Sequence, residues 1–359
     1  MFSNAKTHII EYLEQVEKGD FTARCHLTGN GAVESFEGKL KNFYGVNHAL
    51  CVDSATNGLM YLALAVGLEN QEIVTSPLSY GATISGALWL KNKFHFAGID
   101  ETLNISPETI NDALKENPRI KALYAVDFAG IPHDMLAIRK ICDAYGVWYF
   151  SDAAQSLGAE IKGMKASSLA DAFVVSFSPG KTIFCGEGGC ILTNNTDLYK
   201  RLVTITQHPY RIKRDVALGI SSELALNGRM NPLAAIVGDA VFHSSLMNLK
   251  ERQQEFLKLY IELDKLPMVK PFRFSEKQIL PSFYHLPIMI DDFDLFENEL
   301  DTENKNRCIF REAKAVLELL PDQLKRMSKS RYIKSFYKAT RSILEKLYVF
   351  NINNISSWD

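Results

Sequence analysis

From about residue 45 to 195 the chain alternates short apolar runs with amphipathic segments, and this alternation limits the folds open to it. The apolar runs cover residues 48–55, 72–77, 94–100, 120–128, 146–154, 172–178 and 189–194. In one intervening segment, 134–146, four apolar side chains recur at helical spacing: Met135, Ile138, Ile141 and Cys142. Strands that alternate with helices form a largely parallel sheet covered on both faces. We therefore predict an α/β fold built on these seven strands.

The pattern changes after about residue 240. Long helical patterns such as 246–266 dominate, a strand-like segment follows at 281–291, and 295–359 reads mostly as charged helix. We expect a large domain over residues 1–240 and a smaller C-terminal α/β domain over 241–359. The large domain would begin with a short amphipathic helix, whose apolar side carries Ile9, Ile10, Leu13 and Val16.

Composition argues against a nucleic-acid-binding, membrane or metal-binding protein. Of the 359 residues, 47% are hydrophobic and 23% charged, and the formal net charge is −2, which gives no field that attracts nucleic acid or an anionic membrane. No apolar run is long enough to span a bilayer, and the first residues lack the order of a signal peptide. The six cysteines form no C-x-x-C pair and no histidines have zinc-ligand spacing. We expect a cytoplasmic protein with free thiols and without a metal, membrane or nucleic-acid partner.

Two polar residues stand out near the ends of predicted strands. Asp152 closes the run 146–154, where an unpaired buried charge would be costly. Taken alone, it could equally be a turn or helix-capping residue. Lys181 follows the next strand in a loop rich in glycine and proline, although a lone lysine is usually a solvated surface charge. Ligands bind beyond the carboxyl ends of such strands, so these loops are where a site is expected.

Two nucleotide-binding patterns fail in this region. The triplet Gly180-Lys181-Thr182 resembles the end of a P-loop, but the glycine required five positions earlier is Val175. No G-x-G-x-x-G motif follows an early strand either. Both readings, a nucleotide hydrolase and a dinucleotide enzyme, are therefore weak.

Asp152 and Lys181 match the chemistry of pyridoxal phosphate (PLP) enzymes. These enzymes need a lysine that forms a Schiff base with the cofactor and an acid against the pyridinium nitrogen. Lys181 and Asp152 supply both groups. They also need a phosphate cup, commonly at a helix N-terminus. The cup is predicted at Ala55-Thr56-Asn57, where the first strand passes directly into a helix, although Thr56 could simply cap that helix.

Two more residues could complete such a site. Ser176, five residues before the lysine, could offer a hydroxyl. Tyr80 could stack on the cofactor ring, or it could be a core aromatic whose hydroxyl reaches water.

In this order along the chain, the motifs resemble those of the DegT-type sugar aminotransferases, a branch of fold type I PLP-dependent enzymes. The resemblance runs from about residue 28 to 262. It rests on five segments: the entry segment 27–56, Asp152-Ala153-Ala154-Gln155, Ser176 to Lys181, Gly186 to Gly189, and Asn227 to Asn231. It implies the fold type I architecture, with a mostly parallel seven-stranded sheet between helices in the large domain and a smaller C-terminal α/β domain.

The resemblance also implies a role for each matching residue. Lys181 would hold the cofactor and move the proton, Asp152 would contact the pyridine nitrogen, and Gln155 would bind the ring hydroxyl. Tyr80 would stack on the ring. The phosphate would be bound by Ser176, Ala55, Thr56 and Asn57. Asn227 would reach the phosphate of the neighbouring subunit, which makes the expected enzyme a homodimer with shared sites, although a turn residue beside Gly228 is the alternative.

The activity implied is that of an aminotransferase of polysaccharide or antibiotic biosynthesis. It would move an amino group from glutamate to a keto sugar, typically linked to a nucleotide, and pass through pyridoxamine phosphate. A second possibility is another carbanion-based reaction of a PLP enzyme, such as dehydration, but in this family sugar dehydration accompanies loss of the lysine that is present here as Lys181. A third is a non-catalytic regulatory or binding subunit with the same fold.

The chain departs from the family pattern at three places. Relatives usually read Asn-Tyr-Arg-Met-Asp where this chain has Asn227-Gly228-Arg229-Met230-Asn231, and often have Asn where it has Thr182. Residues 295–359 lack the His- and Pro-rich loop that helps to form the acceptor pocket. Five basic residues could meet a diphosphate: His208, Arg211, Lys213, Arg214 and Arg229. The segment 207–215 could instead be a solvated loop.

Overall fold

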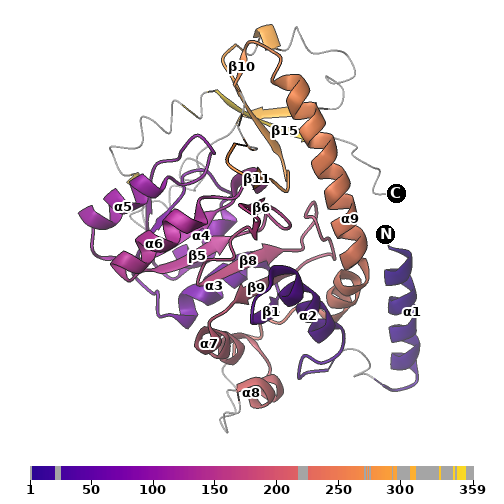
Figure 1. Ribbon diagram of the computed structural model, residues 1–359. Helices are drawn as coiled ribbons and strands as arrows, with labels where there is room; N and C mark the ends of the chain where they lie inside the picture. The colour runs from indigo at the N-terminus through magenta and orange to yellow at the C-terminus, as the bar shows by residue number, and fades with distance from the viewer. Residues whose placement is uncertain are drawn as a thin grey trace.

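The computed structural model describes residues 2–20, 26–216, 225–270, 272, 274, 276–292, 294–296, 308–312, 331–332, 343 and 346–352. Its largest sheet has the order β1-β9-β8-β5-β4-β2-β3-β14 (Figure 1). The strands are β1 (His48–Val52), β2 (Glu72–Thr75), β3 (Lys93–Phe96), β4 (Ile120–Val126), β5 (Trp148–Asp152), β8 (Ala172–Ser176), β9 (Gly189–Thr193) and β14 (Arg331–Tyr332). All seven predicted strands are present. The eighth, β14, comes from the C-terminal part of the chain and was not predicted.

The sheet is mostly parallel, as predicted. Strands β8, β5, β4, β2, β3 and β14 are parallel neighbours, whereas β9 runs antiparallel to both β8 and β1. Helices lie on both faces: α3 (Ala55–Ala65), α4 (Ala82–Trp89) and α7 (Thr196–Thr206) on one, and α2 (Ala32–Tyr44), α5 (Pro107–Glu116), α6 (Met135–Tyr145) and part of α9 (Pro232–Leu263) on the other.

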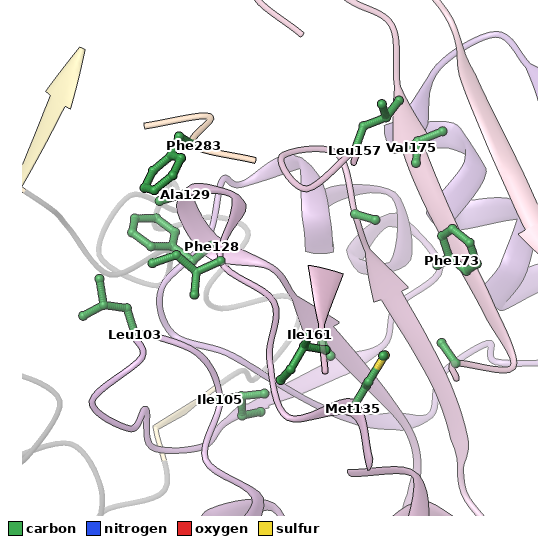
Figure 2. Packing of buried hydrophobic residues seen from close by; sticks show 14 of the residues in the cluster. Leu103, Ile105, Phe128, Ala129, Met135, Leu157, Ile161, Phe173, Val175 and Phe283 are labelled. Carbon is green, nitrogen blue, oxygen red and sulfur yellow. The ribbon is translucent and has the colours of Figure 1, made fainter. Parts of the chain in front are cut away.

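Successive residues of the central strands pack into two different hydrophobic clusters, which explains why these strands read as continuous apolar runs. In β8, Phe173 and Val175 face the cluster that includes α5 and α6, and Val174 faces the one that includes α3 and α4. This is the two-residue alternation of a strand buried on both sides. Figure 2 shows part of the first cluster.

A smaller antiparallel sheet packs at the far end of α9 (Figure 1). Its order is β10-β12-β15-β13, from β10 (Val269–Lys270), β12 (Leu286–Ile290), β13 (Cys308–Glu312) and β15 (Leu347–Ile352). A third sheet joins β11 (Ile279–Leu280) to β6 (Glu160–Ile161) and β7 (Met164–Lys165). The reading of 295–359 as mostly helical is therefore wrong at β13 and β15, where strand pairing and the β-favouring residues of 347–350 outweigh the charged composition.

The predicted domain boundary lies inside a helix. Helix α9 runs without interruption from Pro232 to Leu263, past residue 240, and extends from the large sheet to the small one (Figure 1). The two-domain division stays a prediction.

At the other end of the chain, α1 (Ser3–Glu17) packs on α9 and forms the predicted first helix, but two residues of its apolar side, Ile10 and Leu13, are exposed.

A buried ion pair joins three elements beside the first strand. Arg211 of α8 (Pro209–Val216) is 1% exposed, and its Nη2 donates to Glu37 Oε2 at 2.8 Å while its Nε donates to Asp215 at 3.1 Å. The other oxygen of Glu37 accepts the Cys51 amide of β1 at 2.7 Å. The solvated-loop reading of 207–215 is therefore wrong, because α8 is anchored by this pair, and Arg211 already has two carboxylate partners.

Replacing Arg211 tests how much this pair stabilises the fold. We expect Arg211→Met to lower the free energy of unfolding by about 3–5 kcal/mol, because Glu37 would stay buried without its partner. Chemical denaturation at neutral pH measures the change. The matched control is Arg119→Ala, whose side chain is 71% exposed and pairs with Glu72 at 3.1 Å, and which should cost no more than about 1 kcal/mol. Equal losses in the two variants would contradict this account.

Candidate active site

The carboxyl ends of three parallel strands meet at one edge of the large sheet. Asp127 follows β4, Asp152 ends β5 and Ser176 ends β8. Val126 of β4 is paired with Asp152 of β5, and Asp152 is paired with Val174 of β8. The carboxyl ends of these three strands therefore lie next to one another. Polar side chains that are far apart in sequence are thus brought together at the edge where open α/β sheets bind ligands.

Asp152 is the buried acid of this edge. It is 8% exposed, and its Oδ2 accepts a hydrogen bond from Thr83 Oγ1 at 2.6 Å while Oδ1 accepts the Ala154 amide at 3.0 Å. Burial raises the pKa of the Asp152 carboxyl, whereas the Thr83 hydrogen bond and the positive charge of Lys181 act in the opposite direction. A cation placed against this carboxylate would therefore be strongly favoured.

Lys181 lies in the loop after β8, beyond the same edge. Gly180, with a φ of 82°, turns the backbone directly before it, and the Lys181 amide donates to Ser178 O at 3.2 Å. The side chain is half-buried, and its Nζ lies 4.1 Å from the centre of the Tyr284 ring. A primary amine and a buried acid thus share one site.

The first turn of α3 forms a potential anion site next to these residues. Ser54 caps the helix: its Oγ accepts the Asn57 amide at 3.1 Å, so the cap is Ser54 rather than Thr56. The amides of Ala55 and Thr56 belong to the first turn, which has no intrahelical acceptors for them. A Cβ on Gly189 would lie 2.6 Å from Ala55 N, so only glycine lets β9 pass this close to the helix start.

Two other predicted residues face the same region. Ser176 is buried, with its Oγ 3.2 Å from Ser178 Oγ. The side-chain oxygen of Gln155 accepts the Ala129 amide at 2.7 Å, which leaves the amide nitrogen of Gln155 as the group that can donate to a ligand. The Asn57 side chain donates to Asp53 at 2.7 Å, so it is already engaged within the chain.

A second buried acid, Asp127, holds the turn that carries Gln155. It accepts hydrogen bonds from the hydroxyls of Ser156 and Ser167 at 2.6 and 2.7 Å, and His133 Nδ1 lies 2.7 Å from its other oxygen. Burial by itself would raise the pKa of Asp127, but the charge and hydrogen bond of His133, with the two hydroxyls, lower it overall. No sequence motif pointed to this cluster, because its members are spread along the chain and meet only in the folded protein.

The last two predicted residues, Tyr80 and Asn227, lie at the margins of this group of polar side chains. Tyr80 precedes α4 and is 73% exposed, so most of its side chain is left open by the described part of the chain. Asn227 has a φ of 55°, and its Oδ1 accepts from Arg229 Nε at 2.6 Å. Asn227 and Arg229 are among the residues that line a cavity of about 330 Å³. Asp53 donates its amide to Gly228 O at 3.1 Å, which places the segment of Asn227 beside the start of α3.

Neither a membrane-spanning helix nor a metal-binding cluster occurs within the described residues. None of the helices there is both long and apolar enough to cross a bilayer. No group of three or more His, Cys, Asp or Glu side chains is placed there to hold a metal ion.

Comparison with known proteins finds one aminotransferase family and relatives named as transaminases. The model of the DegT/DnrJ/EryC1/StrS aminotransferase family matches residues 4–313. Over 283 residues, 76% of this chain and 74% of the relative, the sequence is 30% identical to the UDP-4-amino-4,6-dideoxy-N-acetyl-beta-L-altrosamine transaminase of Campylobacter jejuni.

Two solved structures show the same fold at low sequence identity. One is Helicobacter pylori PseC, an aminotransferase involved in the biosynthesis of pseudoaminic acid, with a TM-score of 0.80, 23% identity, and coverage of 98% of this chain and 91% of that one. The other is GDP-4-keto-6-deoxy-D-mannose-3-dehydratase of E. coli with bound hydrated PLP, with a TM-score of 0.78, 17% identity, and coverage of 98% and 92%.

The hydrogen bond from Thr83 to Asp152 can be tested by Thr83→Val, which keeps the shape of the side chain. The folded-state pKa of Asp152 lies above its ordinary value of about 4, so its ionisation costs stability as the pH rises through that pKa. Removing one donor raises the pKa further. We expect a loss of about 1–2 kcal/mol in unfolding free energy near pH 7 and a smaller loss below pH 4.

Denaturation curves at several pH values measure this effect. Thr204→Val is the matched control, since the Thr204 hydroxyl makes only an exposed hydrogen bond to Lys200 O within its helix. A loss for Thr83→Val that does not change with pH would contradict the proposed link to Asp152.

Proposed function

The chain belongs to the DegT/DnrJ/EryC1/StrS aminotransferase family, and on this premise we propose that it is a PLP-dependent enzyme that transfers an amino group from glutamate to a nucleotide-linked keto sugar. The observation that carries this proposal is the position of Lys181, close enough for its charge to act on the buried Asp152 carboxyl at one edge of the sheet. A lysine and a buried acid are the two side chains that PLP catalysis requires.

The residues of this edge fit PLP on structural grounds. Asp152 is a buried carboxylate whose direct hydrogen-bond donors are a hydroxyl and an amide, so a protonated ring nitrogen would give it a charged partner. The first turn of α3, with Gly189 close behind it, offers Ala55 and Thr56 amides and the positive end of a helix dipole to the phosphate. Ser176 adds a hydroxyl, whereas the side chain and amide of Asn57 are engaged by Asp53 and Ser54 and would have to be released to join the cup.

When bound, PLP supplies an aldehyde that reacts with the lysine and a ring that accepts an electron pair. The amine of Lys181, once free, would take the proton from the α-carbon of the amino donor and hold it for return. Asp152 would keep the ring nitrogen protonated. The amide nitrogen of Gln155, whose oxygen is engaged by Ala129, would donate to the ring hydroxyl, and the exposed ring of Tyr80 would be available to cover the cofactor.

We also propose that the enzyme is a homodimer with shared sites. Asn227 and Arg229 line the 330 Å³ cavity from one chain, and in the dimer Asn227 would reach the phosphate bound by its partner. Arg214 forms ion pairs with Asp215 and Glu34, so Arg229, with His208 nearby, is the better candidate to meet a diphosphate. The relatives named as UDP-sugar transaminases support such an acceptor.

The alternatives predict different behaviour. A dehydratase of this fold would make little use of the Lys181 amine in shuttling protons, and a non-catalytic subunit would not turn over an amino donor. The presence of Lys181 beside Asp152 favours transamination over both.

Absorption spectra of the purified protein with PLP test the proposal. We expect a visible band from the bond between Lys181 and PLP, and we expect glutamate to bleach it as pyridoxamine phosphate forms. Lys181→Ala should lack the band and the borohydride-trapped adduct. Lys140→Ala, which changes an exposed lysine of α6, is the matched control and should behave like the wild type.

Other outcomes are equally informative. A band that glutamate leaves unchanged would contradict glutamate as the donor. The absence of any band in the wild type would contradict the enzyme proposal and favour a non-catalytic subunit.

A further inference from the structure

An aromatic side chain from outside the large sheet lies against the amine of Lys181. Tyr284 lies in the segment that leads into β12, and its ring faces the Lys181 Nζ at 4.1 Å from the ring centre. A lysine ammonium at this distance over an aromatic face is held by the negative charge of the ring's π-system. None of the sequence motifs pointed to this residue.

The backbone before Tyr284 is held in an unusual conformation. Phe283 has a φ of 51°, which is rare for a bulky residue, and it is fully buried. Its ring stacks on Phe256 with centroids 5.4 Å apart and meets Phe274 edge-on. Figure 2 shows Phe283 beside Ala129. Such strain persists only where the surroundings fix it, and it is concentrated at functional sites.

Hydrogen bonds tie this segment to the loops of the active site. Ser282 donates its amide to Gly130 O at 2.9 Å and its hydroxyl to Gln155 O at 2.6 Å, and the His285 amide donates to Ala129 O at 3.3 Å. A Cβ on Gly130 would collide with Ser282 Oγ, so a glycine is needed for this close approach. The position of Tyr284 is therefore fixed relative to Gln155.

Arg252 of α9 fixes the other side of the contact. Its Nη2 donates to Thr182 Oγ1 at 2.9 Å and to Ser282 O at 3.2 Å, so it joins the residue after the lysine to the segment of Tyr284. Burial lowers the pKa of Arg252 to about 10. Two charged groups thus lie in this region: Asp152, on which the charge of Lys181 acts, and Arg252, which contacts the residue next to the lysine.

We propose that the ring face of Tyr284 is the position that receives the Lys181 ammonium whenever the lysine is not bonded to the cofactor. This proposal rests on the proposed function. In the proton transfer, the C–H bond of the amino donor would break, an N–H bond would form on Lys181, and a bound cofactor would take up the electron pair. Lys181 would then give up the same proton. Tyr284 gains and loses no proton, so its ring face matters and its hydroxyl does not.

Two substitutions separate the ring from the hydroxyl. Tyr284→Phe keeps the aromatic face, and Tyr284→Leu removes it. Tyr284→Gln serves as a second non-aromatic variant in case the leucine variant does not fold, which circular dichroism shows. Tyr145→Leu is the matched control, because Tyr145 is a surface tyrosine, 41% exposed, that donates to Asn111.

The first measurement needs no cofactor. Apo protein is labelled with acetic anhydride over a range of pH, and the acetylation of Lys181 is followed by mass spectrometry. In Tyr284→Leu the pH of half-maximal reactivity should fall by about one unit, because the ammonium loses the ring that stabilises it. In Tyr284→Phe and in the control it should not change.

The second measurement is the half-reaction with glutamate, followed as the single-turnover loss of the visible band. We expect its limiting rate constant to fall about tenfold in Tyr284→Leu with the half-saturating glutamate concentration nearly unchanged, and we expect Tyr284→Phe to remain close to the wild type. The inference is overturned if the leucine variant labels like the wild type, or if the phenylalanine variant is as impaired as the leucine variant. A wild type that forms no band with PLP would contradict the proposed function instead, and the labelling would still test the contact between Tyr284 and Lys181.

Discussion

Burying the Asp152 carboxylate at the end of β5 costs free energy that the surrounding elements must offset. Thr83 from α4 and the Ala154 amide supply two hydrogen bonds, and the charge of Lys181 adds to them. These groups still leave the pKa of the carboxyl above its ordinary value. A buried acid that is only partly compensated favours a cationic ligand, and a protonated pyridine nitrogen meets that requirement.

The parallel sheet explains how the remaining groups reach this acid. Strand ends align at one edge, so the loop after β8 delivers Ser176 and Lys181 next to Asp152, and the step from β1 into α3 delivers the phosphate cup. The small sheet contributes differently. Its segment before β12 is bonded to Gly130 and Gln155, and it places Tyr284 over the lysine. The site therefore depends on elements from both sheets.

The strands and the local motifs could be predicted from sequence because each is encoded within a short window. Continuous apolar runs mark strands buried on both faces, and Lys181 lies within a recognisable turn. The errors fall where long-range contacts decide. The pair of Arg211 with Glu37 anchors α8 in a segment for which a solvated loop was one of two readings, and strand pairing overrides the helical appearance of 308–312. Four residues of the site region gave no local signal, because distant segments bring them to it: Asp53, Thr83, Asp127 and Tyr284.

A crystal structure of the protein grown with PLP would test the central claim most directly. We predict continuous density from Lys181 Nζ to the cofactor, the ring nitrogen within hydrogen-bonding distance of Asp152, and the phosphate on the Ala55 and Thr56 amides. PLP bound through another lysine, or with its ring nitrogen away from Asp152, would contradict the account.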